Sequence, residues 1–218
     1  MHTYVKVLTK IASRYAPSRM LSFESVHVFK VFQLLDKKGF VSRAFLCQEL
    51  ALGEGSIKTL VKHLNRQGLI KSTNHGTQLT EKGKTIALEL LRSIPVETEM
   101  PKCSIALGKF NYAVLLKKAS FAIKSGIEQR DAAIKVEALG ATTLLCKDHR
   151  FTMPGSSSKD SLQIDPNIAK LLVNKLMPED NDVIIIGSDA QDIRTAELGA
   201  KNAALSTIMI HKKHSPMP

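Results

Sequence analysis

The chain has 218 residues, which is enough for two small domains that each bury a core of their own. Its formal net charge is +11, and the surplus is local: residues 1–92 carry 15 Lys and Arg against 6 Asp and Glu, whereas residues 93–218 carry 16 against 14. Such a local surplus is typical of a surface that binds the phosphates of nucleic acid. The alternative is a charge that serves solubility alone.

The composition argues against secreted, membrane and metal-binding classes of protein. Cys47, Cys103 and Cys146 lie far apart and form no CxxC pair, which disfavours a disulfide framework and a zinc site. Lysines interrupt the N-terminal segment between Tyr4 and Tyr15, and no stretch has the length of a transmembrane helix. We therefore expect a cytoplasmic protein that has no membrane contact, metal or other cofactor.

Helical patterns fill the chain before residue 69. Apolar residues recur at spacings of three and four and predict a first helix that ends near Gly39: Val28, Phe29, Phe32 and Leu35. Ser42 is a predicted N-cap of a short second helix. A tight connection at residues 52–56 leads to a third helix that ends at Gly68 and has four inward residues: Ile57, Leu60, Val61 and Leu64.

A hairpin and a further helix complete the pattern of the first ninety residues. Residues 69–72 and 78–79 read as two short strands, joined by a turn at Asn74, His75 and Gly76. Thr80 has the hydroxyl that a following helix needs as its cap. The order helix, helix, short turn, helix, hairpin, helix predicts a winged helix-turn-helix.

The outer face of the third helix carries the groups that we expect to contact DNA. They suit hydrogen bonding to base edges and charge pairing with phosphates in a major groove: Ser56, Lys58, Thr59, Lys62, His63 and Arg66. A second set on the hairpin and at the base of the next helix is expected to contact the backbone: Lys71, His75, Lys82 and Lys84. For any single lysine, a solvated surface charge is the simpler interpretation.

The segments at residues 52–60, 69–72 and 79–84 resemble a group of archaeal two-domain proteins, which pair a winged helix with a C-terminal domain of unknown function. The similarity continues at residues 126–135 and 140–144, so that it covers most of the chain after residue 20. The resemblance implies a transcriptional regulator and implies no ligand.

The second half of the chain is predicted to form an α/β domain. Residues 93–102 contain two prolines and no helical period, which indicates a linker before a domain at residues 103–210 and a tail at residues 211–218. Three apolar runs read as buried strands: Tyr112–Leu116, Thr142–Cys146 and Val183–Ile186. Helical segments alternate with them. The expected fold class is thus α+β, a winged helix-turn-helix followed by a small sandwich with a mixed or partly parallel sheet.

Two segments of this domain are candidate ligand sites. Gly187, Ser188 and Asp189 end a strand before a helix N-terminus, where backbone amides favour an anion, although ordinary N-capping is the preferred interpretation. The other segment packs three charges into one helical turn: Glu128, Arg130 and Asp131. Arg130 is a candidate for binding a carboxylate or phosphate, and the alternative is an exposed turn in which Asp131 pairs with Lys135.

The leading hypothesis is a transcriptional regulator that binds double-stranded DNA and whose C-terminal domain senses a small-molecule effector, mediates homodimerisation, or does both. Residues 1–20 are a candidate helical dimerisation arm, whose apolar stripe alternatively packs on its own domain: Tyr4, Leu8, Ile11 and Tyr15. The other hypothesis is a protein-interaction module of the transcription or RNA-processing machinery. The sequence has no Ser-His-Asp order and no HExxH motif, so an enzyme is not expected.

Overall fold

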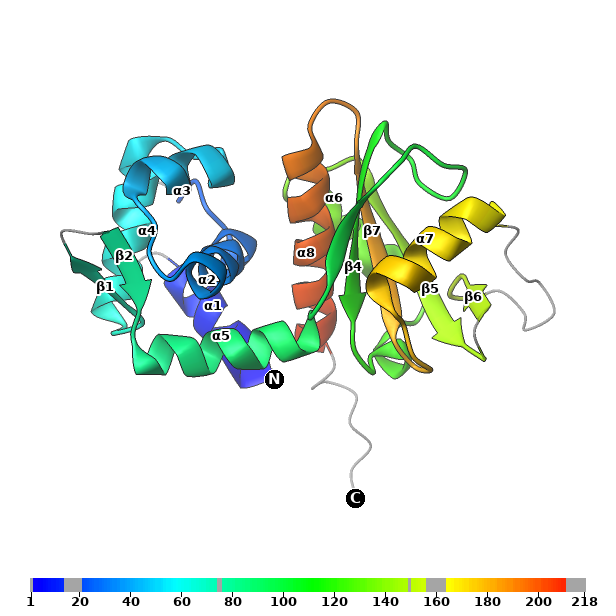
Figure 1. Cartoon of the computed structure of the whole chain (residues 1–218), viewed down its shortest axis with the longest axis horizontal. Helices are drawn as coiled ribbons and strands as arrows, with labels where there is room; N and C mark the ends of the chain where they lie inside the picture. Colours follow the sequence, from blue (N-terminus) through cyan, green and yellow to red (C-terminus); the bar gives the residue numbers. More distant parts are fainter. Residues whose placement is uncertain (1, 14–20, 74–75, 149, 156–163, 211–218) are drawn as a thin grey trace, which may run out of the picture. The chain divides into compact units, whose positions relative to one another are not determined.

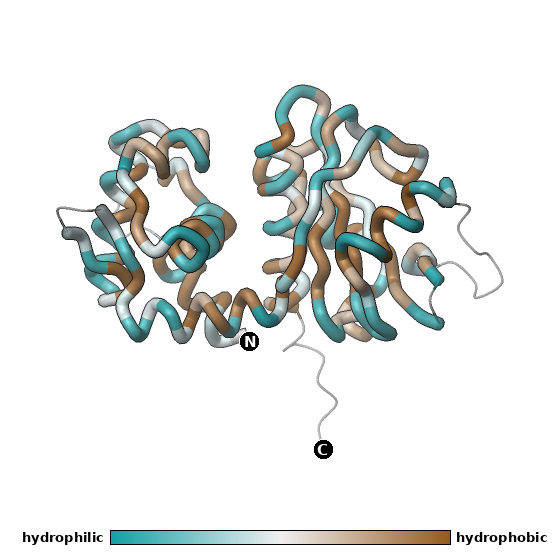
Figure 2. Tube along the Cα trace, viewed as in Figure 1, coloured by the Kyte–Doolittle hydropathy of each residue, from teal (hydrophilic) through white to brown (hydrophobic). Residues whose placement is uncertain are grey.

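The computed structural model describes residues 2–13, 21–73, 76–148, 150–155 and 164–210 (Figure 1). The chain divides after Arg92 into two compact units, Met1–Arg92 and Ser93–Pro218. In Figure 2 hydrophobic residues concentrate in the central strands and on the buried sides of helices, and hydrophilic residues concentrate at the turns. Each unit therefore has a core of its own.

The N-terminal unit contains helices and one hairpin, in the order that the sequence predicts. Its elements are α1 (His2–Ile11), α2 (Ser25–Lys38), α3 (Arg43–Leu50), α4 (Glu54–Arg66), β1 (Ile70–Thr73), β2 (Gly76–Leu79) and α5 (Glu81–Ser93). Strands β1 and β2 are antiparallel, with Ile70 opposite Leu79. An isolated bridge between Val41 and Thr77 adds the segment before α3 to this small sheet.

Local hydrogen bonds explain where these helices begin. The Ser42 hydroxyl oxygen accepts from the Phe45 amide at the start of α3, which confirms the predicted cap. The Thr80 hydroxyl oxygen likewise accepts from the Gly83 amide at the start of α5. Each cap satisfies a backbone donor that has no partner within its own helix.

Helix α1 is part of the core of its own unit. Val5, Leu8 and Ile11 are buried, and α1 packs against α2 and α4. The alternative interpretation, in which the apolar stripe packs on its own domain, therefore holds for Leu8 and Ile11, whereas Tyr4 is only partly buried. A role of residues 1–20 as a dimerisation arm stays a prediction. Tyr15 lies outside the described residues.

The C-terminal unit is built on a five-stranded sheet in the order β3-β4-β7-β5-β6, in which every neighbouring pair is antiparallel. Its strands are β3 (Glu97–Met100), β4 (Phe110–Leu116), β5 (Gly140–Lys147), β6 (Arg150–Thr152) and β7 (Val183–Asp189). Its helices are the short 3-10 helix η1 (Ser120–Ala122), α6 (Ile127–Ile134), α7 (Pro166–Leu176) and α8 (Ile193–Ile210).

The expectation of a mixed or partly parallel sheet is wrong. Strands β4 and β5 do run in the same direction, with α6 between them in the sequence, but β7 lies between them in the sheet and is antiparallel to both. The alternation of strands and helices predicted the direction of β4 and β5. It could not reveal which strand would become their neighbour.

The prediction of a linker at residues 93–102 is also wrong, because these residues include an edge strand of the sheet. Strand β3 pairs with β4, and Met100 is buried in the core. Pro95 and Pro101 flank the strand without interrupting it. A strand of four residues with two glutamates has too little apolar content to stand out in the sequence.

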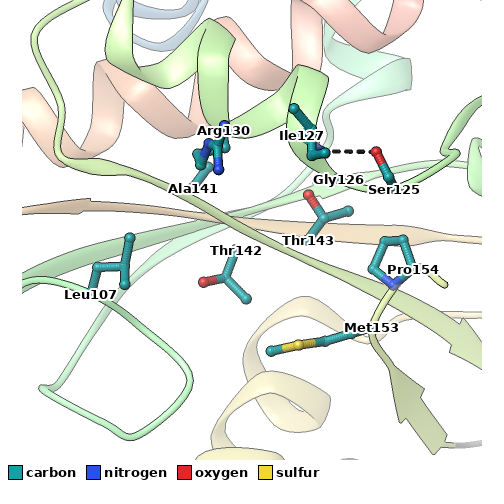
Figure 3. A pocket seen from close by; sticks show the side chains of 10 residues that line it. All are labelled: Leu107, Ser125, Gly126, Ile127, Arg130, Ala141, Thr142, Thr143, Met153 and Pro154. Atoms are coloured by element: carbon teal, nitrogen blue, oxygen red, sulfur yellow. Dashed lines mark hydrogen bonds between the residues drawn. The ribbon is translucent and has the colours of Figure 1, made fainter. Parts of the chain in front are cut away.

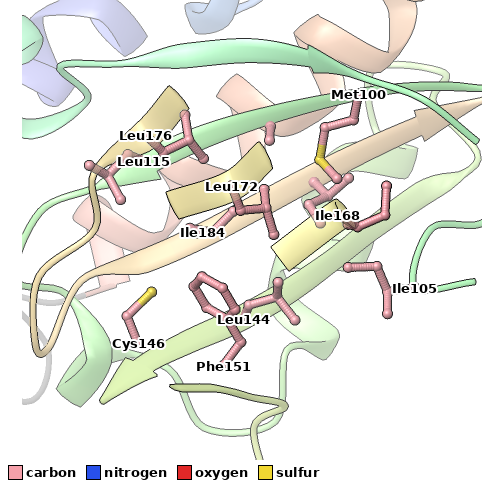
Figure 4. Packing of buried hydrophobic residues seen from close by; sticks show 12 residues of the cluster. Met100, Ile105, Leu115, Leu144, Cys146, Phe151, Ile168, Leu172, Leu176 and Ile184 are labelled. Carbon is pink, nitrogen blue, oxygen red and sulfur yellow. The ribbon is translucent and has the colours of Figure 1, made fainter. Parts of the chain in front are cut away.

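Helices cover both faces of the sheet. Figure 1 shows α6 and α8 on one face and α7 on the other, where α7 closes a hydrophobic cluster that includes Leu144, Phe151 and Leu172 (Figure 4). On the opposite face α8 lies directly on β7: a Cβ atom at Gly187 would come within 2.1 Å of the Ala196 carbonyl oxygen. Gly187 thus permits close packing of a helix on the sheet.

Candidate nucleic-acid interface and ligand pocket

Helix α4 separates apolar from basic residues on its two sides. Ile57, Leu60 and Leu64 are fully buried, whereas Lys58, Lys62 and Arg66 are exposed. Because these three basic residues are spaced by four, they follow one another along the same side of the helix. The predicted division of α4 into core and surface positions therefore holds for these six residues.

A groove beside this basic row has a volume of about 340 Å³. Its lining comes from α3, α4 and β1: Arg43, Lys58, Val61, Lys62, Asn65, Arg66 and Ser72. Four of these side chains are cationic and none is acidic, so the groove is suited to a polyanion. The Asn65 amide nitrogen lies 3.5 Å from the Ser72 hydroxyl oxygen and links α4 to the hairpin.

Three polar residues of the groove were not predicted from the sequence as site residues: Arg43, Asn65 and Ser72. Arg43 directly follows the predicted N-cap Ser42, and Ser72 lies in a predicted strand, but their approach to α4 depends on tertiary packing. Asn65, which directly precedes the predicted contact Arg66, is the one of these three residues that the sequence places beside a predicted contact.

The prediction that His63 faces DNA is wrong. Its side chain is 7% exposed, and its Nδ1 donates to the Ile11 carbonyl oxygen at 2.8 Å. The Phe23 ring packs edge-on against the imidazole, with 5.8 Å between the ring centroids. His63 therefore joins α4 to α1 in the core and is not available to a nucleic acid.

The other predicted DNA contacts occupy different environments. Ser56 and Thr59 are partly exposed, and the Thr59 hydroxyl donates to the Gly55 carbonyl oxygen at 2.9 Å. Lys71 is exposed on β1. His75 lies outside the described residues.

Lys82 and Lys84 make local interactions at the start of α5. The Lys82 ammonium group donates to the Gln67 carbonyl oxygen at the end of α4, at 3.0 Å. Lys84 pairs with Glu81 at 2.8 Å, and this hydrogen bond lowers the pKa of the Glu81 carboxyl. These two lysines lie outside the lining of the groove.

In the C-terminal unit, the segment Gly187–Asp189 has structural roles, which corrects its prediction as a ligand site. It belongs to β7 and is buried. The Ser188 hydroxyl donates to Asn111 Oδ1 at 2.8 Å, and the Asp189 carboxylate accepts from the amides of Gln191 and Asp192. The preferred interpretation from the sequence, a turn capped by its own side chain, agrees with these contacts.

The second predicted segment, on α6, borders a pocket. Arg130 is half-exposed and forms an ion pair with Asp131, whose Oδ1 lies 3.0 Å from Arg130 Nη2. Asp131 thus pairs with the preceding residue Arg130, whereas the alternative interpretation of the sequence had paired it with Lys135. Glu128 is partly buried, and neither Glu128 nor Asp131 lines the pocket.

The pocket beside α6 has a volume of about 290 Å³ (Figure 3). Its lining combines apolar side chains with hydroxyl groups and one cation: Leu107, Ser125, Gly126, Ile127, Arg130, Ala141, Thr142, Thr143, Met153 and Pro154. Arg130 and Thr143 are brought together from α6 and β5. Of these ten lining residues, Arg130 alone was predicted from the sequence as a site residue.

A buried polar cluster on the α8 side of the sheet was not predicted. The side chain of Lys201 is 1% exposed, donates to Glu97 Oε1 at 2.9 Å and also binds Glu197. The Tyr112 hydroxyl donates to the same Glu97 oxygen at 3.0 Å, and burial together with the charge of Glu97 raises the pKa of Tyr112. The cluster ties β3, β4 and α8 together, so we assign it a structural role.

Within the described ranges, no group of three or more His, Cys, Asp or Glu side chains is placed to hold a metal ion. Over the same ranges no helix combines the length and the apolar character needed to cross a membrane.

Comparison with known proteins identifies both units. Residues 29–85 match the family model of the PH0730-like N-terminal domain, and residues 107–208 match a domain of unknown function, DUF4443. No curated protein matches the chain. Among solved structures, the hypothetical protein PH0730 from Pyrococcus horikoshii OT3 is 30% identical, with a TM-score of 0.67 over 88% of this chain and 95% of that chain. The chain therefore belongs to the PH0730 family of two-domain proteins.

Proposed function

We propose that the N-terminal unit is a winged helix that binds duplex DNA, and that the protein acts as a transcriptional regulator. The observation that carries this proposal is the groove beside α4, in which Arg43, Lys58, Lys62 and Arg66 gather without a carboxylate in the lining. Neutralising phosphates with such side chains releases counterions and is a principal source of DNA affinity.

In this proposal α4 enters the major groove and the hairpin β1-β2 is the wing. Lys58 and Lys62 follow one side of α4 and are placed for phosphate contacts. Arg66 at the end of this row and its neighbour Asn65 are of the residue types that bind guanine and adenine edges, respectively, in two-point contacts. His63 supports this arrangement from the core, because its bond to Ile11 holds α4 against α1.

The first prediction is that duplex affinity falls steeply with salt. The logarithm of the association constant should fall by about 0.9 for each phosphate contact per logarithmic unit of salt concentration. Fluorescence anisotropy of a labelled duplex, titrated with the full chain at several KCl concentrations, measures this slope. Affinity that is absent, or that does not depend on salt, would overturn the proposal.

A pair of double variants tests whether the groove is the contact surface. The variant Lys58→Ala/Lys62→Ala should reduce the steepness of the salt slope by about 2, because two phosphate contacts are lost. The control Lys6→Ala/Lys37→Ala removes the same charge from exposed positions on α1 and α2 and should leave the slope nearly unchanged. Equal losses in both variants would show attraction to net charge rather than binding in the groove.

The apolar stripe of α1 no longer supports a homodimer, because Leu8 and Ile11 are buried within their own unit. Homodimerisation stays a prediction, which sedimentation of the full chain with and without duplex would test.

A further inference from the structure

We propose that the pocket beside α6 binds a small organic anion with a compact apolar body. The pocket lies entirely in the C-terminal unit and is lined by Arg130, three hydroxyl residues and several apolar side chains (Figure 3). This inference does not rest on DNA binding by the N-terminal unit. Three features of the pocket support it: an unpartnered hydroxyl, the N-terminus of α6 and the guanidinium of Arg130.

The first feature is the hydroxyl of Thr143. This residue is 4% exposed, and its Oγ1 has no hydrogen-bond partner among the residues that the structure describes. Figure 3 shows the hydroxyl directed toward Gly126 and Ile127 at the start of α6, and Oγ1 lies 3.6 Å from the position that a Cβ atom of Gly126 would occupy. Buried hydroxyl groups in native proteins almost always have a partner, so this group indicates that a bound molecule supplies one.

The second feature is the start of α6 above this hydroxyl. The N-cap of α6 is Gly126, whose φ is 79°. Because this residue is a glycine, no side chain covers the first turn of the helix. Amides in the first turn of a helix have no partner within the helix and form a positive pole for an anion. The Ile127 amide lies 3.4 Å from the Ser125 hydroxyl oxygen, so the hydrogen of that hydroxyl remains available to a ligand.

The third feature is Arg130, one turn further along α6. Its Nε and Nη2 both contact a single oxygen of Asp131, which leaves Nη1 for a second acceptor. Its side chain passes over Gly140, where an added Cβ atom would lie 3.3 Å from Arg130 Cγ. The guanidinium therefore reaches the pocket over a position that has no side chain.

The pocket opens along a free edge of the sheet. Strand β6 pairs with β5 only at Leu145–Lys147, so that no described strand pairs with the preceding residues Ala141–Leu144 on that side. Successive residues of a strand face opposite sides of its sheet, so Thr142 and Thr143 line the pocket from the two sides of this edge.

Apolar side chains define the rest of the ligand. Leu107 and Met153 line the pocket away from the start of α6 (Figure 3). Pro154 lies beside the N-cap of α6, since a Cβ atom at Gly126 would come within 3.6 Å of Pro154 Cγ. None of the ten lining residues is acidic. A volume near the lower end of small-molecule sites fits a ligand of about ten non-hydrogen atoms, with its anionic group at Arg130 and Thr143.

The test is an NMR titration of the full ¹⁵N-labelled chain with three probes. Sodium benzoate and phenyl phosphate carry a carboxylate and a phosphate on the same apolar ring, and benzamide is the uncharged analogue of benzoate. We expect saturable shifts of the Gly126, Ile127 and Thr143 amides with at least one anion, with a Kd of about 1 mM or lower. Benzamide should produce no saturable shift. The tighter anion identifies the head group.

Variants separate the pocket from general attraction of anions. Arg130→Gln should weaken binding at least about tenfold. Arg194→Gln is the matched control, because Arg194 is exposed to 47% against 51% for Arg130 and also pairs with a nearby aspartate. Thr143→Val should weaken binding, whereas Thr143→Ser should preserve it because the hydroxyl remains.

Three outcomes would overturn the inference. They are the absence of saturable shifts at about 10 mM of either anion, equal binding of benzamide, and equal losses in Arg130→Gln and Arg194→Gln. The spectrum of each variant reports whether it folds. Because no DNA is present, the result is separate from that of the salt titration.

Discussion

At the scale of single residues, the partner of a buried polar group decides how that group is interpreted. His63 looked like a surface residue of α4, but its ring is buried and bound to the Ile11 carbonyl oxygen. Thr143 is buried to a similar degree, and no described residue is a hydrogen-bond partner of its hydroxyl. The first is a structural residue of the core, and the second carries a cost in stability that a ligand would offset.

This difference predicts the effect of Thr143→Val on the free protein. Replacing an unpartnered buried hydroxyl by a methyl group of the same shape should raise the free energy of unfolding by about 1 kcal/mol. Urea denaturation without ligand measures the change. The matched control is Thr207→Val: this buried hydroxyl accepts from Gln129 and donates to Ala203, so its loss should destabilise the protein by about 1 kcal/mol. Equal destabilisation by both variants would refute this account of Thr143.

The site residues that the sequence revealed are those whose position follows from helical period alone. Lys58, Lys62 and Arg66 lie on the exposed side of α4 because the apolar positions fix the opposite side. Arg43 and Thr143 reach their sites through contacts between elements distant in sequence. No periodicity within one segment can reveal such contacts.

At the scale of elements, an added helix changes which side of its neighbour is buried. The apolar stripe of α4 predicted one buried side, but α1 packs on α4 as well and covers His63. The same limitation applies to the sheet. The apolar strands β4, β5 and β7 were predictable from composition, whereas the short edge strands β3 and β6 and the central place of β7 depend on pairing partners.

Helix α2 provides a prediction about pH. Its capping box joins Glu24 and His27, and burial lowers the pKa of His27 from 6.5 to about 4. The unfolded chain therefore takes up a proton as the pH falls below 6.5, while the folded chain does not until about pH 4. Above pH 6.5 His27 is neutral in both states and the free energy of unfolding is not reduced by its titration. Between pH 6.5 and pH 4 the free energy of unfolding falls, by up to about 3 kcal/mol.

The variant His27→Gln isolates this contribution. Glutamine also suits this position of a capping box and does not titrate. The free energy of unfolding, measured by urea denaturation between pH 4 and 7, should fall less steeply with acidification in the variant. The same pH dependence in both proteins would show that His27 does not contribute.

At the scale of the whole molecule, the division after Arg92 makes a prediction about fragments. Residues 93–218 include β3, whose Met100 enters the core and whose Glu97 binds the buried Lys201. A fragment of residues 93–218 should therefore unfold cooperatively on heating, as followed by circular dichroism.

A fragment of residues 103–218 tests the same point from the other side. It lacks β3, so it exposes the edge of β4 and removes one carboxylate from Lys201. It should unfold at a clearly lower temperature or lack a cooperative transition. Equal melting temperatures of the two fragments would show that residues 93–102 do act as a linker.

The central place of β7 also sets the order in which the protein can fold during synthesis. Strands β4 and β5 do not pair with each other. Both pair with β7, residues 183–189, which leaves the ribosome after them. At about 5–20 residues per second, translation leaves both strands without their shared partner for seconds. The N-terminal unit, whose residues all leave the ribosome before β4, can fold during that time. The nascent C-terminal unit is therefore where a ribosome-associated chaperone should bind this chain.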